Sequence, residues 1–465
     1  MSDHGIWVVS TTLAKPDAET QKLIRSHAMR GKNTRKVKDV RRLTRLMDNY
    51  DSEWGIGKSP RGIDDPEEAE WIPRPARKIA SELSLFDLAI EKKPYILELL
   101  HRAFTTIKPS TYAIETAIVD GTRDDMICFS SIQHEPAMIH SILFVAQSLY
   151  DSLSQAPCNK IAQYHFGQTL KLLQEKLSNK NIATTKTTLI IVLTLASASA
   201  MLGDVGNTQK HMDGLYQIIS LRGGLDSLGP GSMIEHKAQR IDFALALATG
   251  GKTRFFREGI SWGPNIALDQ APSHCPELSM LHPHLDPRLL CIWADLKEFA
   301  KVANMATQTG VKMSSGFFSR LTTSIPYRLV RLQYDPLSAP ELLRLCMLAF
   351  TKCILIQVKG LGKHLTYLAT SLKTTLLAHR SLSIGGVTPP LLIWAVFMTA
   401  FSIYEDFDSD WLCEIFTSSV LLLGVRTWLD MKAVLRKFLW IDLVYDKQAE
   451  LLFQQWHGKE NEIRG

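Results

Sequence analysis

The sequence predicts an all-α protein, a large irregular bundle or superhelix of antiparallel helix pairs that follows a basic, partly disordered N-terminal arm. Apolar residues recur every three or four positions over most of the chain after residue 75, and alternating strand-like runs are scarce. Glycine, proline and polar residues separate these apolar stretches at short intervals, which favours antiparallel neighbours. No repeat of fixed length is present, so a regular solenoid is not predicted.

Size and composition are those of an ordinary globular protein. The 465 residues are 45% hydrophobic and 22% charged, with a net charge of +6. This length is sufficient for a large core, and the mild charge argues against a general polyanion-coating role. Dispersed cysteines without a secretory signal favour reduced thiols in an intracellular compartment.

The N-terminal part differs from the rest of the chain. Ten cations and a single acid, Asp39, lie between Lys22 and Arg45. Glycine, proline and mixed charge between residues 51 and 75 are typical of a linker. We therefore divide the chain into a basic arm and linker at residues 1–75 and a helical domain at residues 76–465.

Helical periodicity predicts the elements of the second part in order. The apolar runs at residues 189–202 and 391–403 are too short to cross a bilayer, so we expect buried helices there. The predicted helices span residues 135–154, 161–178, 187–203, 208–222, 234–249, 287–307, 339–358, 361–381, 389–404, 409–429 and 431–439.

The helix predicted before residue 223 has a clear apolar face and a clear end. Its apolar positions are Met212, Leu215, Ile218 and Ile219. Gly223 and Gly224 should end it, because a left-handed residue beyond a helix terminus costs glycine little. Arg222 in the last turn favours the negative end of the helix dipole.

This segment also resembles a known family. It reads His211-x-x-Gly214-Leu215 and then Leu221-Arg222-Gly223-Gly224-Leu225, which is similar to the regulatory domain of fungal zinc-cluster transcription factors. The small-residue-rich run at 187–203 and Ile292-Trp293-Ala294-Asp295-Leu296 resemble further elements of that domain. The resemblance implies a helical regulatory domain, in which the structural residues of the motif are Gly214, Leu215, Arg222, Gly223, Gly224 and Leu225.

The DNA-binding part of that family has no counterpart among the cysteines. A zinc cluster requires six thiolates in one short basic segment, and no cysteine precedes Cys128. Zinc-dependent DNA binding therefore cannot be carried over from the resemblance. Residues 24–32, IRSHAMRGK, resemble an opening motif of fungal regulators that lack a zinc cluster.

The basic segment has two interpretations. It is a solvated helix face, or it is a nuclear import signal, a phosphate-contacting arm or both. No aromatic residue lies within residues 22–47, so we expect any DNA contact there to be nonspecific and salt-sensitive. The residues assigned to import or phosphate contact are Arg30, Lys32, Arg35, Lys36, Lys38, Arg41, Arg42 and Arg45.

Several patterns that suggest chemistry lack a necessary part. The run GGKT at 250–253 has Ala246 where a phosphate-binding loop needs glycine, and it follows a predicted helix, so a helix cap is favoured. His134 and His140 are six residues apart and do not share a helix face, whereas the two zinc ligands of a metalloprotease helix must do so. The acids at 406, 408 and 410 lack the glycine and glutamate of a calcium loop, and they favour a cap near Ser409. A proline-broken loop with no standard zinc spacing holds His274, Cys275, His282 and His284.

The sequence thus predicts a nuclear transcriptional regulator without a metal, a cofactor or an enzymatic activity. We expect contacts with other transcription regulators or the transcription machinery, including a zinc-cluster partner that supplies DNA specificity. An import receptor, nonspecific DNA, and a homo- or heterodimer are further expected partners; a membrane is not. We also expect a small effector in an apolar cavity between helices. The alternatives are a cytoplasmic helical interaction module and, less favoured, a helical enzyme.

Overall fold

The computed structural model describes residues 87–120, 132–154, 159–229, 231–257, 259–267, 275–281, 285–358, 361–380, 387–404 and 409–464. All of them lie in the unit Ile72–Gly465. These residues form helices joined by turns, with an isolated bridge between Val119 and Met313 and no strand among the described ranges. The predicted all-α class is confirmed. The arm and the boundary at residue 75 lie outside the described residues and stay predictions.

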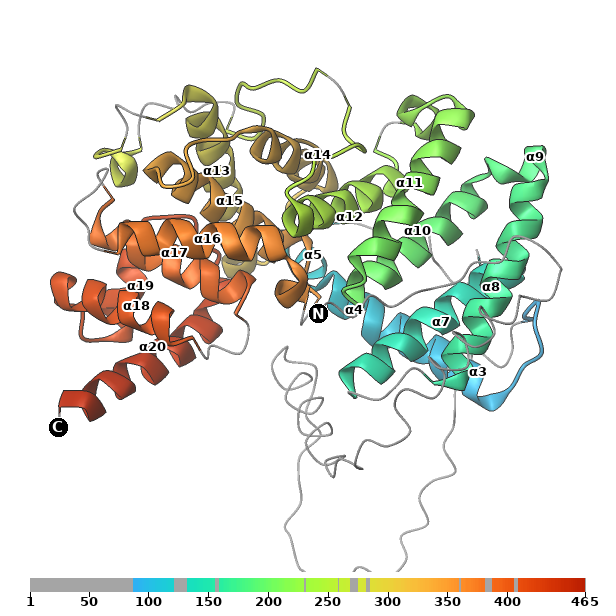
Figure 1. Ribbon diagram of the computed structural model, residues 1–465, viewed down its shortest axis with the longest axis horizontal. Helices are drawn as coiled ribbons and strands as arrows, with labels where there is room; N and C mark the ends of the chain where they lie inside the picture. The colour runs from blue at the N-terminus through green and yellow to red at the C-terminus, as the bar shows by residue number, and fades with distance from the viewer. Residues whose placement is uncertain are drawn as a thin grey trace, which may run out of the picture. The chain divides into compact units, whose positions relative to one another are not determined.

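The first group of helices surrounds one hydrophobic core. Figure 1 shows α7 and α8 packed side by side, and likewise α10 and α11. The strongly apolar α10 is buried from Thr188 to Leu193, as expected for an internal helix. The elements are α3 (Pro94–Arg102), the π-helical turn η2 (Ala103–Ile107), α4 (Lys108–Thr111), α5 (Ala113–Ile118), α7 (Pro136–Leu153), α8 (Lys160–Ser178), α9 (Lys180–Ala183), α10 (Lys186–Met201), α11 (Val205–Arg222), the 3-10 turn η3 (Leu225–Leu228) and α12 (Met233–Thr249).

The second group surrounds a larger core. Its centre is α17, in which every side chain from Leu391 to Ser402 is buried against neighbours that include α15 and α18. Trp293 and Trp394 meet edge to face within this core. The elements are η4 (Pro276–Leu278), α13 (Pro287–Thr309), α14 (Ser315–Arg331), α15 (Ala339–Leu355), η6 (Leu361–His364), α16 (Thr366–His379), α17 (Pro389–Ser402), α18 (Asp410–Leu423), α19 (Trp428–Leu435) and α20 (Asp442–Arg464).

One helix, α12, contributes to both cores. Phe243 and Leu247 belong to the larger core, whereas Ile234 and Leu245 belong to the smaller one. Because α12 is covered on two sides, its polar residues can reach solvent or a cavity only along a narrow stripe. This position makes α12 the element on which the candidate site is built.

Most predicted helices are confirmed to within a few residues, and the exceptions have local causes. The helix predicted at 409–429 ends at Leu423 because Gly424 adopts a left-handed conformation with φ of 65°. The helix predicted at 361–381 is divided at Leu365, whose ψ of 60° is not helical. The prediction omitted the longer helices α3, α14 and α20; of these, α14 contains Pro326, a residue that normally interrupts a helix.

None of the described helices is by itself long and apolar enough to cross a membrane. The pair α18 and α19, bent by 96°, passes that test only when the two are taken together.

Candidate functional site

The signature helix α11 ends as the sequence predicts. Gly223 has φ of 113°, and its N–H donates to the Ser220 carbonyl at 3.1 Å. The Gly224 N–H donates to the Ile219 carbonyl at 2.9 Å, which completes a Schellman motif. Gly224 has φ of 81° and ψ of −173°, a conformation available essentially to glycine alone. Both glycines are therefore required by the backbone.

The other signature residues have unequal roles. Leu215 is fully buried, and Leu225 packs against the same core. The Arg222 guanidinium donates to the Thr184 carbonyl at 2.5 Å and so ties the end of α11 to the turn before α10. A Cβ added at Gly214 would meet no heavy atom within 4 Å. The structure therefore gives no steric reason for glycine at that position.

The downstream motif, residues 292–296, anchors a loop. Asp295 of α13 is fully buried and accepts N–H donors from Asn265, Ile266 and Ala267 at 2.9, 2.7 and 2.9 Å. It also forms a buried ion pair with Arg328 of α14, whose guanidinium donates to the Gly263 carbonyl at 3.1 Å. These bonds fix the loop 263–267 in place. Arg328 was not predicted as an anchoring residue, because no helix was predicted at α14.

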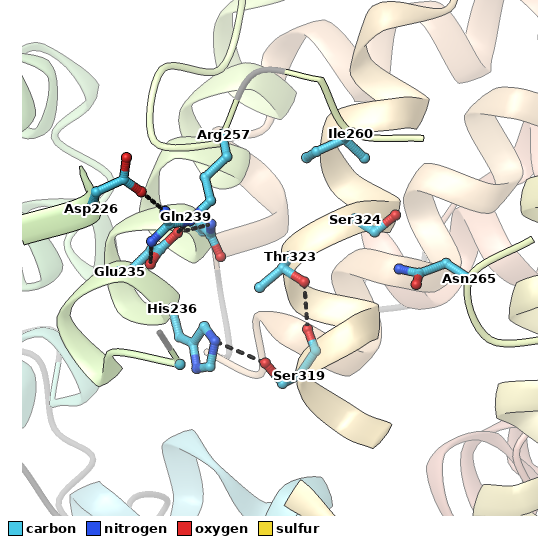
Figure 2. A pocket seen from close by; sticks show the side chains of 11 residues that line it. Asp226, Glu235, His236, Gln239, Arg257, Ile260, Asn265, Ser319, Thr323 and Ser324 are labelled. Carbon is cyan, nitrogen blue, oxygen red and sulfur yellow. Dashed lines mark hydrogen bonds and ion pairs between the residues drawn. The ribbon is translucent and has the colours of Figure 1, made fainter. Parts of the chain in front are cut away.

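A polar cavity of about 500 Å³ lies beside this loop. Figure 2 shows α12 on one side and α14 on the other. Arg257 and Ile260, from the loop that follows α12, lie above them. Asp226, in the turn that follows the signature glycines, also reaches the wall. The lining residues are Asp226, Gly231, Glu235, His236, Gln239, Arg257, Ile260, Asn265, Ser319, Thr323 and Ser324.

The charges in the cavity are largely paired with one another. Arg257 Nε and Nη2 donate to the two Glu235 carboxylate oxygens at 3.1 and 3.0 Å, and the guanidinium also pairs with Asp226. The Glu235 hydrogen bonds are the main reason that the pKa of Arg257 is raised. Two carboxylates, Asp226 and Glu235, stand against one guanidinium on the wall, and their formal charges sum to −1.

Two buried polar atoms on opposite walls lack partners. Gln239 Nε2 donates to Glu235 Oε1 at 3.4 Å. The other polar atom of this side chain, Gln239 Oε1, has no hydrogen-bond partner among the described residues. Ser324 Oγ is also buried without a hydrogen-bond partner among the described residues. Gln239 is 1% exposed and Ser324 is 3% exposed, so each unsatisfied atom carries a cost of about 1–3 kcal/mol.

A second cavity resembles the expected apolar one but is smaller. Its volume is about 120 Å³, and it lies between α7, α10 and the π-helical turn η2. Phe104, Ile142 and Leu193 are among the apolar side chains that line it, and Lys108 and Lys237 lie at its edge. The larger cavity with unsatisfied groups is thus polar, whereas an apolar cavity was expected.

The remaining sequence patterns are structural or lie outside the described residues. Gly250 ends α12 with φ of 73°, so the interpretation of the run at 250–253 as a helix cap is confirmed. Burial raises the pKa of the Cys275 thiol; the histidines predicted beside it lie outside the described residues. Within the described ranges, no three His, Cys, Asp or Glu side chains are placed to hold a metal ion. The basic residues Arg30, Lys32, Arg35, Lys36, Lys38, Arg41, Arg42 and Arg45 are also outside the description.

A buried histidine pair joins α7 and α8. His140 Nδ1 and His165 Nδ1 are hydrogen-bonded at 2.7 Å, and Tyr95 Oη lies 3.4 Å from His165 Nε2. Burial, and then the neighbouring His140, lowers the pKa of His165 to about 4. Burial also lowers the pKa of His140. Both rings are therefore held neutral near pH 7.

Part of this helical unit matches a known protein family. The family model that matches is the fungal specific transcription factor domain, over residues 115–248, from α5 to the end of α12. The predicted resemblance is confirmed, and no zinc cluster domain was detected. The matched family is a transcription factor regulatory domain, which suggests a role in transcription regulation. Neither the curated proteins nor the solved structures gave a match.

Proposed function

We propose that this protein is a nuclear transcriptional regulator that acts through its helical domain together with a DNA-binding partner. The match of residues 115–248 to the fungal regulatory domain carries the proposal. A partner is proposed because residues 1–127 contain no cysteine, whereas a zinc cluster needs six thiolates. The partner would be another transcription regulator that supplies sequence-specific contacts.

The basic segment is proposed to carry nuclear import. Clustered lysine and arginine side chains fit acidic receptor grooves and neutralise phosphates without reading sequence. Direct DNA contact by this segment would then be weak, nonspecific and strongly salt-dependent. In this proposal the segment sets location, and the partner sets the target.

Localisation of the tagged full-length protein tests import. Replacing Arg35, Lys36, Lys38 and Arg41 with glutamine should exclude the protein from the nucleus. The matched control removes the same charge from exposed helical positions, with glutamine replacing Lys160, Lys171, Lys180 and Lys186. We expect this control to remain nuclear, and an unrelated import signal should restore the first variant. Exclusion of the intact protein from the nucleus would favour a cytoplasmic interaction module.

Chromatin immunoprecipitation followed by binding assays tests the partner. The protein should occupy defined genomic sites in cells. Purified full-length protein should bind an enriched site and a scrambled duplex with equal affinity, both falling steeply with salt. A preference of more than about 10³-fold for the enriched site by the purified chain alone, a ratio typical of specific binders, would contradict the need for a partner.

A further inference from the structure

We propose that the cavity between α12 and α14 binds a small polar molecule that is rich in hydroxyl or amine donors and carries no net negative charge. Its volume of about 500 Å³ falls within the roughly 300–1,000 Å³ range of small-molecule sites. The proposed ligand binding depends on the cavity alone and does not require the function proposed above. Control of transcription by that ligand rests on the function proposed above.

The charge balance selects against anionic ligands. Arg257 is already engaged by both oxygens of Glu235 and by Asp226, so its positive charge is compensated before any ligand enters. A ligand carboxylate or phosphate would meet two carboxylates for one guanidinium. Neutral and cationic ligands meet no such repulsion.

The unsatisfied groups select for hydrogen-bond donors. Gln239 Oε1 can only accept, because it is an amide carbonyl oxygen, and Ser324 Oγ can accept or donate. The two residues line the cavity from facing helices, as Figure 2 shows, and a donor-rich ligand that reaches either oxygen relieves the cost of leaving it unpaired. Apart from Gly231 and Ile260, every lining residue has a polar or charged side chain, which favours a polyol or an amine over an acyl chain.

The site is held in shape before binding. Asn265 is on the wall, and its backbone N–H donates to buried Asp295 at 2.9 Å. His236 Nε2 and Ser319 Oγ, on opposite helices, are hydrogen-bonded at 2.9 Å. A cavity fixed in this way spends little binding free energy on ordering, which favours affinity for a small ligand.

A thermal-shift screen of the purified full-length protein tests the proposal. The probes are neutral polyols (glucose, ribitol, myo-inositol), amines (putrescine, spermidine, glucosamine) and anions (citrate, phosphate, glucarate). At least one polyol or amine should raise the Tm in a saturable manner, and calorimetry should give a defined stoichiometry. Comparison of the polyols with the amines shows whether the cavity prefers hydroxyl or amine hydrogen-bond donors. Stabilisation by anions alone, or by no probe, overturns the proposal.

Two variants locate binding in the cavity. Ser324→Ala removes a buried, unpartnered hydroxyl, so the ligand-free Tm should be unchanged or higher, while affinity falls about five- to tenfold. Gln239→Leu should weaken binding at least as much. The matched controls Ser418→Ala and Gln209→Leu, on α18 and α11, should bind like the wild type. Unchanged affinity in both cavity variants would overturn the site.

The same probe separates this inference from the proposed function. Binding to the purified protein, lost in Ser324→Ala, supports the cavity whether or not the chain is nuclear. If binding is confirmed but target transcripts do not respond to the probe in cells, the regulatory role fails and the site stands.

Discussion

Removing the charge of Arg328 should be among the most destabilising single changes in the helical domain. Arg328→Met leaves the Asp295 carboxylate fully buried without its cation, although three backbone N–H groups still donate to it. Breaking a buried pair in this way costs about 3–5 kcal/mol. Because a native domain is stable by only about 5–15 kcal/mol, the variant should approach its unfolding threshold.

Urea unfolding of paired variants measures this effect. Asp295→Asn can keep the acceptor for the loop N–H groups but leaves Arg328 uncompensated, so a similar loss is expected. The double variant should lose less free energy of unfolding than the two single variants together, and the difference should be about 1–3 kcal/mol. The control is Lys301→Met on α13, which breaks an exposed pair with Glu298 and should cost about 0–1 kcal/mol. If Arg328→Met behaves like this control, the anchoring role of the pair is wrong.

The remaining predictions concern glycine geometry and pH. Gly223→Val should destabilise the fold by about 1–3 kcal/mol, because valine resists the positive φ there, whereas Gly214→Ala should stabilise by about 0.5–1 kcal/mol; unchanged melting of the valine variant would refute this. Gly362→Ala should lower the Tm, because its Cβ would lie 2.6 Å from the Ser402 carbonyl oxygen; a wild-type Tm would contradict that packing. The folded-state pKa of His165 lies below its unfolded value of about 6.5, so stability should fall as the pH drops from about 6.5 toward about 4; His165→Asn should reduce this dependence, with His140 contributing to the remainder, and an identical pH profile would exclude His165 as a source.

Local signals in the sequence were sufficient for much of the fold. The end of α11 followed from Gly223 and Gly224, and the burial of α17 followed from its uninterrupted apolar run. Helices α3, α14 and α20 were not predicted. Proline is unfavourable inside a helix, yet the buried residues around Pro326, including Leu321 and Ile325, keep α14 helical.

The candidate site was harder to predict because its parts come from distant segments. Gln239 lies in a predicted helix, but Ser324, on the facing wall, lies in α14, which was not predicted. Similarly, Asp295 was singled out by the family resemblance, whereas its partner Arg328 had no signal of its own. Such pairs depend on how helices pack, and hydrophobic periodicity does not specify that packing.

The double role of α12 has a practical consequence for dissecting the protein. The family match stops at residue 248, one position before the end of a helix that serves two cores. A fragment trimmed to the matched segment would expose Phe243 and Leu247 to water and should aggregate or melt at low temperature. Recombinant pieces intended for crystallography or interaction screens should therefore retain the chain through α20.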